Sequence, residues 1–246
     1  MRSPLITVAV PSYNHSMYLN KALDSIVQQN IAIEILVMDG GSNDGSIDII
    51  QQWSSRLFYW RSHKDCGQAS AINEAIAKGS APYVCWLNSD DWYLTNGLQQ
   101  LYAVLEANPN APAAYGRAWN FIEQRQLQKS VWVEPFNEKR LAKRCIIAQP
   151  ATLIRRSAWK MVGGLDESLH MAMDYDLWWK LFKFSGPLVF LDQVIAVNRD
   201  HQLTKTKNNR RLHYKEAMRI VKKYNNYVPL KWWLYQPYAV WFKALN

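Results

Sequence analysis

The sequence feature that most constrains the fold is a regular alternation of short apolar segments with amphipathic segments over residues 5–107. The apolar segments are bounded by turn residues, which predicts buried strands at residues 5–10, 33–38, 57–60 and 83–87. Between them, apolar side chains recur every three or four positions, as on one face of a helix, for example at Leu19, Ala22, Leu23 and Ile26. Strands that alternate with helices form β-α-β units, so we predict an α/β fold in which helices cover both faces of a mainly parallel sheet.

The second half of the chain is less regular. Short apolar pieces at residues 113–119, 131–133 and 146–156 predict a mixture of strands and loops, and residues 188–197 predict a last strand. A predicted helix between them carries Asp174 and Asp176 near its start. Acidic residues are common in the first turn of helices, so a capping role and a chemical role both remain open for these two carboxylates.

An acidic pair, Asp90 and Asp91, follows the apolar segment 83–87 directly. Adjacent carboxylates repel each other unless a cation or strong hydrogen-bond donors lie nearby, and a hard divalent metal prefers oxygen ligands of this kind. The carboxyl ends of strands are also where open α/β sheets bind ligands. The alternative is a solvated turn capped by Asp, and the pair alone does not decide between the two.

A second acidic loop, DGGSNDGS, begins at Asp39 after the predicted strand 33–38. The spacing of its glycines differs from the GxGxxG fingerprint of dinucleotide-binding folds, which argues against an NAD site. Asp39 lies at the carboxyl end of its strand, where a carboxylate can accept hydrogen bonds from a nucleobase or a ribose.

Length and composition predict one main domain with a small appendage. The chain has 246 residues, 49% of them hydrophobic, yet no run of eighteen uncharged apolar residues that would predict a membrane-spanning helix. The N-terminus enters a strand pattern at once and does not resemble a signal peptide. Cys66, Cys85 and Cys145 are odd in number and far apart, so we expect reduced thiols and a cytoplasmic location.

The net charge of +9 is concentrated at the C-terminus, where ten Lys or Arg residues from His201 onward face Glu216 alone. The apolar stripe Tyr214, Ala217, Met218 and Val221 predicts a helix there, and a segment containing Trp232, Trp233 and Trp241 follows. A basic helix beside aromatic residues suits an anionic membrane surface, here the inner face of the cell membrane, but the helix could equally pack on the domain. We expect no nucleic-acid partner, because no recognised module accompanies the charge.

Eight segments, in order, resemble the inverting nucleotide-sugar glycosyltransferases of family 2, of the bacterial type. They are PSYN, MDGGSNDGS, GQASAINEAIAKGS, LNSDD, QPATLIRR, GGLDESL, MDYDLWWKL and the late His201. The resemblance implies a GT-A fold, which is Rossmann-like, with a mixed, mainly parallel central sheet flanked by helices, over residues 1–206. Residues 207–246 would then form a helical extension that is basic and aromatic.

The same resemblance implies a hexosyltransferase-like enzyme that moves a sugar, with inversion, from a nucleoside diphosphate sugar to a hydroxyl of a glycan or a lipid-linked glycan. A UDP-sugar is the expected donor, with GDP- and dTDP-sugars as alternatives. Asp174 matches the general base, and a divalent metal, Mn²⁺ or Mg²⁺, would be held by Asp91 and His201. Asp176 and Gln149 would support the site or contact the acceptor. The matching positions for nucleotide binding are Pro11, Ser12, Tyr13, Asn14, Asp39, Gly67, Asn73 and Asp90.

The chemistry agrees with these roles. A metal stabilises negative charge on a departing diphosphate, and a carboxylate can take the proton of the attacking hydroxyl. The sequence departs from the family pattern at Asn88, Met173 and Ile72, where an acidic residue, a Glu and an Arg are frequent. A non-catalytic nucleotide-sugar-binding or membrane-scaffold protein of the same fold is the alternative. The presence of Asp91 and Asp174 favours the enzyme.

Overall fold

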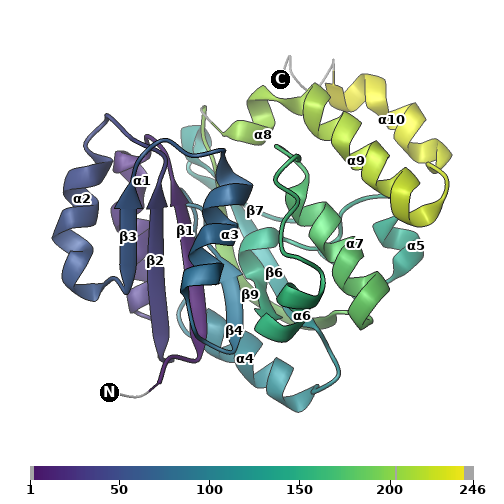
Figure 1. Cartoon of the computed structure of the whole chain (residues 1–246). Coiled ribbons are helices and arrows are strands. Elements are labelled where there is room, and N and C mark those ends of the chain that lie inside the picture. Colours follow the sequence, from purple (N-terminus) through teal and green to yellow (C-terminus); the bar gives the residue numbers. More distant parts are fainter. Residues whose placement is uncertain (1–2, 203, 241–246) are drawn as a thin grey trace.

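A nine-stranded sheet runs through the molecule in the order β3-β2-β1-β4-β8-β6-β9-β5, and β7 pairs with β6 outside this path. The computed structural model describes residues 3–202 and 204–240. Its strands are β1 (Ile6–Ser12), β2 (Ile33–Asp39), β3 (Tyr59–Ser62), β4 (Tyr83–Trp86), β5 (Trp92–Tyr93), β6 (Ala113–Ile122), β7 (Leu127–Ser130), β8 (Thr152–Arg155) and β9 (Val189–Asp200). The carboxyl ends of β1 to β3 point to the upper edge of Figure 1.

The two halves of the sheet differ in strand direction. Strands β3, β2, β1 and β4 are parallel, as the alternation with helices predicts. Beyond β4 the sheet is mixed, because β8 is antiparallel to both β4 and β6, β9 is parallel to β6, and β5 is antiparallel to β9. The predicted mixed α/β sheet flanked by helices is therefore confirmed.

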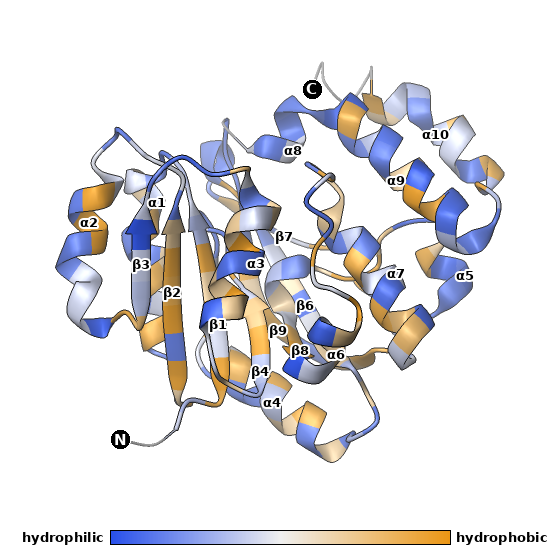
Figure 2. Ribbon diagram, in the orientation of Figure 1, coloured by the Kyte–Doolittle hydropathy of each residue, from blue (hydrophilic) through white to orange (hydrophobic). Residues whose placement is uncertain are grey.

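Helices lie on both faces of this sheet (Figure 1). They are α1 (Ser16–Val27), α2 (Ser46–Trp53), α3 (Gln68–Lys78), α4 (Gly97–Ala107), α5 (Glu138–Leu141), α6 (Arg156–Met161), α7 (Met173–Ser185), α8 (Lys205–Asn208), α9 (Arg210–Asn225) and α10 (Leu230–Val240). Strands β1, β2 and β4 are largely hydrophobic where helices cover them (Figure 2). Trp86 of β4 and Trp178 of α7 are buried and stack with ring centroids 6.0 Å apart, which ties α7 to the sheet.

One strand of the second half lies outside the predicted apolar pieces. Residues 131–133 form no strand, and β7 lies just before them at Leu127–Ser130. All four side chains of β7 are exposed. This strand is therefore held by its backbone hydrogen bonds to β6 and not by burial of apolar side chains. Hydropathy therefore gave no signal for it.

The C-terminal extension packs on the domain. Helix α9 contacts α7, and α10 contacts α9. The stripe Tyr214, Ala217, Met218 and Val221 is buried, which confirms the predicted apolar face of α9. Residues 241–246, including the predicted aromatic Trp241, lie outside the described residues. Within the ranges that the structure describes, no helix combines the length and the hydrophobicity needed to cross a membrane.

Candidate functional site

A cavity of about 1310 Å³ opens at the carboxyl ends of the parallel strands. The end of β1 and the loop after it contribute the predicted residues Pro11, Ser12, Tyr13 and Asn14 to its wall. Further predicted residues come from segments far apart in the sequence, and they are Gly67, Asp90, Asp91, Gln149 and Asp174. The fold thus brings most of the expected site residues around one space.

On one side of the cavity, Asp90, His201 and His15 form a cluster. His201 is only 2% exposed, and its Nε2 lies 3.0 Å from Oδ2 of Asp90. His15 contacts the Ser89 hydroxyl through Nδ1 at 2.8 Å. One ligand atom from each of the three residues lies within 4.8 Å of the others, and two imidazole nitrogens with a carboxylate oxygen fit a first-row divalent metal. His15 was not predicted, although it follows the PSYN motif directly.

Asp91 lies beside this cluster but makes different contacts. Its side chain is 2% exposed, with Oδ1 accepting a hydrogen bond from the Arg199 backbone N–H at 2.8 Å and Oδ2 accepting one from Asn88 at 3.1 Å. Burial, and then the charge of Asp90, raise the pKa of Asp91 well above its usual range. Asp91 therefore ties the loop after β4 to the end of β9, and it is not part of the three-residue cluster.

Asp39 is fully buried behind the cavity wall. Its carboxylate accepts hydrogen bonds from the backbone N–H groups of Gly41 and Ser42, at 3.0 and 2.8 Å, and from the Ser62 hydroxyl at 2.7 Å. Gly41 has a φ of +84°, a left-handed conformation that favours glycine. Asp39 thus shapes the loop, while Gly40 and Gly41 line the cavity.

Asn73 and Gln149, two other predicted contacts, differ in position. Asn73 donates to the carbonyl of Leu165 and accepts from its N–H, both at 3.0 Å, so it joins α3 to a later loop and does not line the cavity. Gln149 lines the cavity and donates to the Trp86 carbonyl at 2.9 Å.

Asp174 and Asp176 face different surroundings. Asp174 lies at the start of α7, is half-buried and lines the cavity. Burial raises the pKa of Asp174, and the nearby His213 opposes this rise. Asp176 is 1% exposed and accepts a hydrogen bond from Tyr224 at 3.0 Å, so its carboxylate is engaged with α9. It is not among the residues that line the cavity.

Basic side chains complete the wall. Lys64, Lys129, Lys205 and Arg199 all line the cavity. Arg199 also pairs with Glu123 at 2.9 Å and lies over the Tyr18 ring at 4.7 Å, which fixes its guanidinium. Cationic side chains at a concave site attract anionic ligands such as phosphates. These four residues were not predicted, since scattered Lys and Arg carry no local signal in the sequence.

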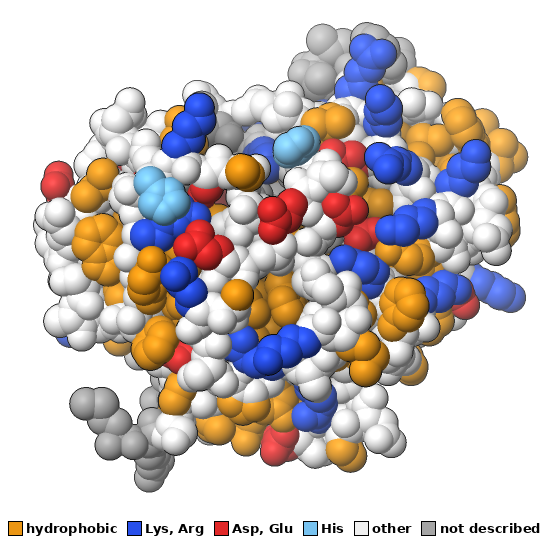
Figure 3. Space-filling model, in the orientation of Figure 1, with side chains coloured by type: hydrophobic (Ala, Val, Ile, Leu, Met, Phe, Trp, Pro, Cys, Tyr) orange, Lys and Arg blue, Asp and Glu red, His pale blue; other side chains and the backbone are white. Residues whose placement is uncertain are grey.

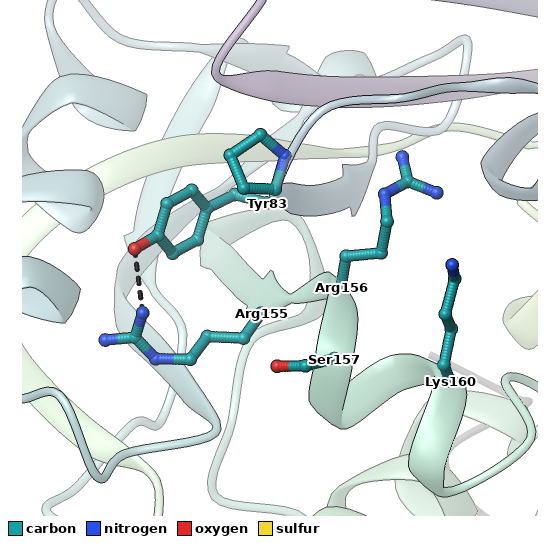
Figure 4. A pocket seen from close by; sticks show the side chains of 6 residues that line it. Tyr83, Arg155, Arg156, Ser157 and Lys160 are labelled. Carbon is teal, nitrogen blue, oxygen red and sulfur yellow. Dashed lines mark hydrogen bonds between the residues drawn. The ribbon is translucent and has the colours of Figure 1, made fainter.

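A smaller pocket of about 420 Å³ lies on the opposite end of β4, lined by Pro82, Tyr83, Arg155, Arg156, Ser157 and Lys160. Arg155 donates to the Tyr83 hydroxyl at 2.8 Å (Figure 4), and Arg156 donates to the carbonyl of Ile76 at 2.5 Å. Both guanidinium groups are thus bound within the fold. Their contacts hold the sheet to the segments around it. The described lining of this pocket contains no cluster of acidic or imidazole groups like that of the larger cavity.

Solved structures share this architecture. The chain superposes on residues 1–349 of Staphylococcus aureus TarS in complex with UDP-GlcNAc with a TM-score of 0.72 at 18% identity, covering 89% of this chain and 66% of that chain. A mannosyltransferase of Pyrobaculum calidifontis in complex with GDP-Man and Mn²⁺ gives a TM-score of 0.67 at 18% identity, over 89% and 65% of the two chains. The GT-A fold is therefore confirmed.

Related sequences point the same way. An uncharacterized glycosyltransferase of Rickettsia typhi is 28% identical over 226 residues, which cover 86% of this chain and 70% of the relative. Chondroitin synthase of Escherichia coli is 25% identical over 196 residues, which cover 78% of this chain but only 28% of that longer protein. Residues 7–160, more than half of the chain, match the model of the family named Glycosyl transferase family 2. The protein therefore belongs to glycosyl transferase family 2 and is a glycosyltransferase.

Proposed function

We propose that the enzyme transfers a sugar from a UDP-sugar to a hydroxyl of a glycan or lipid-linked glycan, with inversion at the anomeric carbon. The observation that carries this proposal is the single cavity lined by Asp90 of the three-residue cluster and by Asp174 at the start of α7. The diphosphate would lie near the cluster and the cationic side chains, and the acceptor would approach from Asp174. The UDP and UDP-GlcNAc complexes of TarS support UDP as the nucleotide, and the GDP-Man complex of the Pyrobaculum calidifontis enzyme makes GDP the main alternative.

We propose that Asp90 and His201 hold a divalent metal, Mn²⁺ or Mg²⁺, with His15 as a third ligand. When bound, the ion would neutralise the charge of the departing diphosphate. Asp91 then supports the site indirectly, because it holds the backbone of Arg199, two residues before His201. Asp39 supports the nucleotide in the same indirect way, through the Gly40 and Gly41 backbone that lines the cavity.

Asp174 is the proposed general base. Its carboxylate must be ionised to accept the proton of the attacking hydroxyl, and a carboxyl pKa above the ordinary range makes it a stronger base at neutral pH. Transfer should be lost as the pH falls, because Asp174 becomes protonated. Since the pKa of Asp174 is raised, this loss should begin at a higher pH than it would for an ordinary Asp. A single displacement with the base opposite the leaving group inverts the anomeric configuration.

The experiment that tests this role replaces Asp174 with Asn, which keeps the size but removes the proton acceptor. Transfer should fall by about 10² to 10⁴, the usual contribution of general base catalysis. UDP affinity, measured by calorimetry, should stay within error of the wild type. Asp176→Asn should mainly lower the melting temperature, because Asp176 contacts α9. A larger rate loss in Asp176→Asn than in Asp174→Asn, or a product with retained configuration by NMR, would contradict the mechanism.

We also propose that the outer face of the C-terminal extension rests on an anionic membrane. Helix α10 exposes five large side chains, which are Leu230, Trp233, Leu234, Tyr235 and Tyr238. Exposed Lys and Arg side chains of α9 lie beside this apolar surface at the upper right of Figure 3. Amphipathic aromatic rings next to positive charge suit the headgroup region of anionic lipids, where a lipid-linked acceptor would be found.

A further inference from the structure

Helix α9 reaches back to the segment that immediately precedes Asp174. Glu216 is the only acidic residue of α9 and is 8% exposed. Its Oε1 accepts a hydrogen bond from the backbone N–H of His170 at 3.1 Å, and its Oε2 accepts from Met171 and Ala172 at 2.8 and 2.9 Å. A single buried carboxylate thus holds three consecutive backbone N–H groups.

These contacts hold the backbone that leads into α7, a helix with no side-chain cap of its own. Ala172 occupies the N-cap position, and its side chain cannot accept a hydrogen bond from the first turn. The first backbone N–H groups of a helix need acceptors, and a negative charge is favourable at this end. Glu216 lies on another helix and places its negative charge at this end, where it accepts from the N-cap residue Ala172 and from the two residues before it, through charge-assisted hydrogen bonds that are stronger than neutral ones.

A second set of contacts anchors α7 after Asp174. Asp176, one turn into the helix, accepts hydrogen bonds from Tyr224 at 3.0 Å and from Lys223 at 3.3 Å. Trp179 and Tyr224 stack with centroids 5.9 Å apart and planes 4° apart. The start of α7 is therefore fixed against α9 on both sides of Asp174.

We infer that Glu216 is a positioning residue for glycosyl transfer, which holds residues 170–172 so that the Asp174 carboxylate faces the cavity. His170 and Met171 line the same cavity, so a shift of this segment would also change its wall. The inference rests on the proposed role of Asp174 as the base. It makes the C-terminal extension part of the catalytic apparatus, although the family match ends at residue 160.

The test is Glu216→Gln, which keeps the shape but replaces one acceptor oxygen with an amide group and removes the charge. We expect kcat to fall by roughly 10- to 100-fold, because a misplacement of a reacting group by about 1 Å has a cost of this size. The donor KM and the UDP affinity should change little, since Glu216 does not line the cavity and the segment that it holds lies beside Asp174, where the acceptor is proposed to approach. Glu216→Leu, which keeps no acceptor, should lose more.

Two comparisons separate positioning from general damage. In an Asp174→Asn background, Glu216→Gln should cost little further activity. The reason is that the effects of two substitutions do not add when both act through the same catalytic group. Tyr214→Phe removes the hydrogen bond of α9 to the Trp232 carbonyl, 2.9 Å long, and should lower the melting temperature with kcat unchanged.

Three results would overturn the inference. The first is a wild-type kcat in Glu216→Gln, which would leave the role of Asp174 intact. The second is the same fold-loss for Glu216→Gln with and without Asp174, which would mean that Glu216 acts through the fold in general. The third is a wild-type kcat in Asp174→Asn, which would remove the proposed base and this inference together.

Discussion

Adjacent residues of the same type have different environments in this site. The Asp90 carboxylate lies 3.0 Å from His201, whereas Asp91 accepts a backbone hydrogen bond from a residue 108 positions away. The difference arises because the chain turns after β4, so that one side chain faces the cavity cluster and the other faces β9. The Asp91 carboxylate is buried, and this burial raises its pKa well above the usual range.

At this scale we predict that His15 binds the metal. His15→Gln should weaken Mn²⁺ binding at least about tenfold, since even second-shell partners of metal ligands contribute 10- to 100-fold. Asp90→Asn should weaken it further. The measurement is the free Mn²⁺ signal in electron paramagnetic resonance, with and without UDP. His63→Gln is the matched control, because His63 is exposed and does not line the cavity. Equal Mn²⁺ affinity in His15→Gln and His63→Gln would remove His15 from the ligand set.

At the scale of elements, a buried carboxylate on β2 holds the turn between α3 and β4. Glu34 is 4% exposed and accepts hydrogen bonds from Thr7, Ser80 and Ala81, while Arg156 lies 4.0 Å away. Burial opposes ionisation of Glu34, but these hydrogen bonds outweigh it and lower the pKa below its usual value. Glu34, at the start of the apolar part of β2, thus has a structural role in the sheet.

Removal of this carboxylate should be costly. Glu34→Ala leaves buried donors without their acceptor and the mostly buried Arg156 guanidinium without a nearby negative charge, so we expect the free energy of unfolding to fall by about 3 to 5 kcal/mol in urea denaturation. Glu138→Ala, which breaks an exposed pair with Lys183, should cost less than about 1 kcal/mol. Because the folded pKa of Glu34 is lowered from 4.5, its contribution should persist above that pH and decline as the pH falls through the folded value. Equal losses in the two variants would refute the assignment.

At the scale of the whole molecule, the C-terminal extension has an inner face that packs on the domain and an outer face that is exposed. The inner face buries Tyr214, Ile220 and Val221 and carries Glu216 to the start of α7. The outer face of α10 exposes Trp233 and Leu234, at 55% and 72%. A chain ending at residue 206 would lose both faces and uncover α7, so membrane attachment is better tested by substitution.

We predict that the double variant Trp233→Ser, Leu234→Ser floats less with vesicles of anionic lipid than the wild type does. Flotation of the wild type should weaken as salt rises, because surface charge is then screened. Phe58→Ser, an equally exposed aromatic far from the extension, should float like the wild type. If wild type and double variant both stay unbound, or float alike, the exposed surface of α10 is no lipid contact.

Many of the elements and the general location of the site could be predicted from the sequence. The periodicity of apolar residues predicted the four parallel strands, the helices between them and the buried stripe of α9, because burial of one face imposes its period on the sequence. Polar and acidic residues directly after two of these strands indicated a site at their carboxyl ends, since parallel strands bring those ends to one edge of the sheet.

Which of these residues lie in contact depends on the tertiary structure. Asp90 lies in a cluster with His15 and His201, whereas Asp91 accepts a hydrogen bond from Arg199. Asp39 lies behind the glycines that line the cavity. Glu216 contacts the segment that leads into the helix that carries Asp174. Some of these contacts join residues far apart in the sequence, and the sequence does not say how far apart such residues lie in space. The others depend on the direction of a side chain, which reverses when a turn is one residue longer or shorter. They depend on how β9 pairs with β5 and β6 and on how α9 packs on α7, because such packing brings together groups that have no local signal.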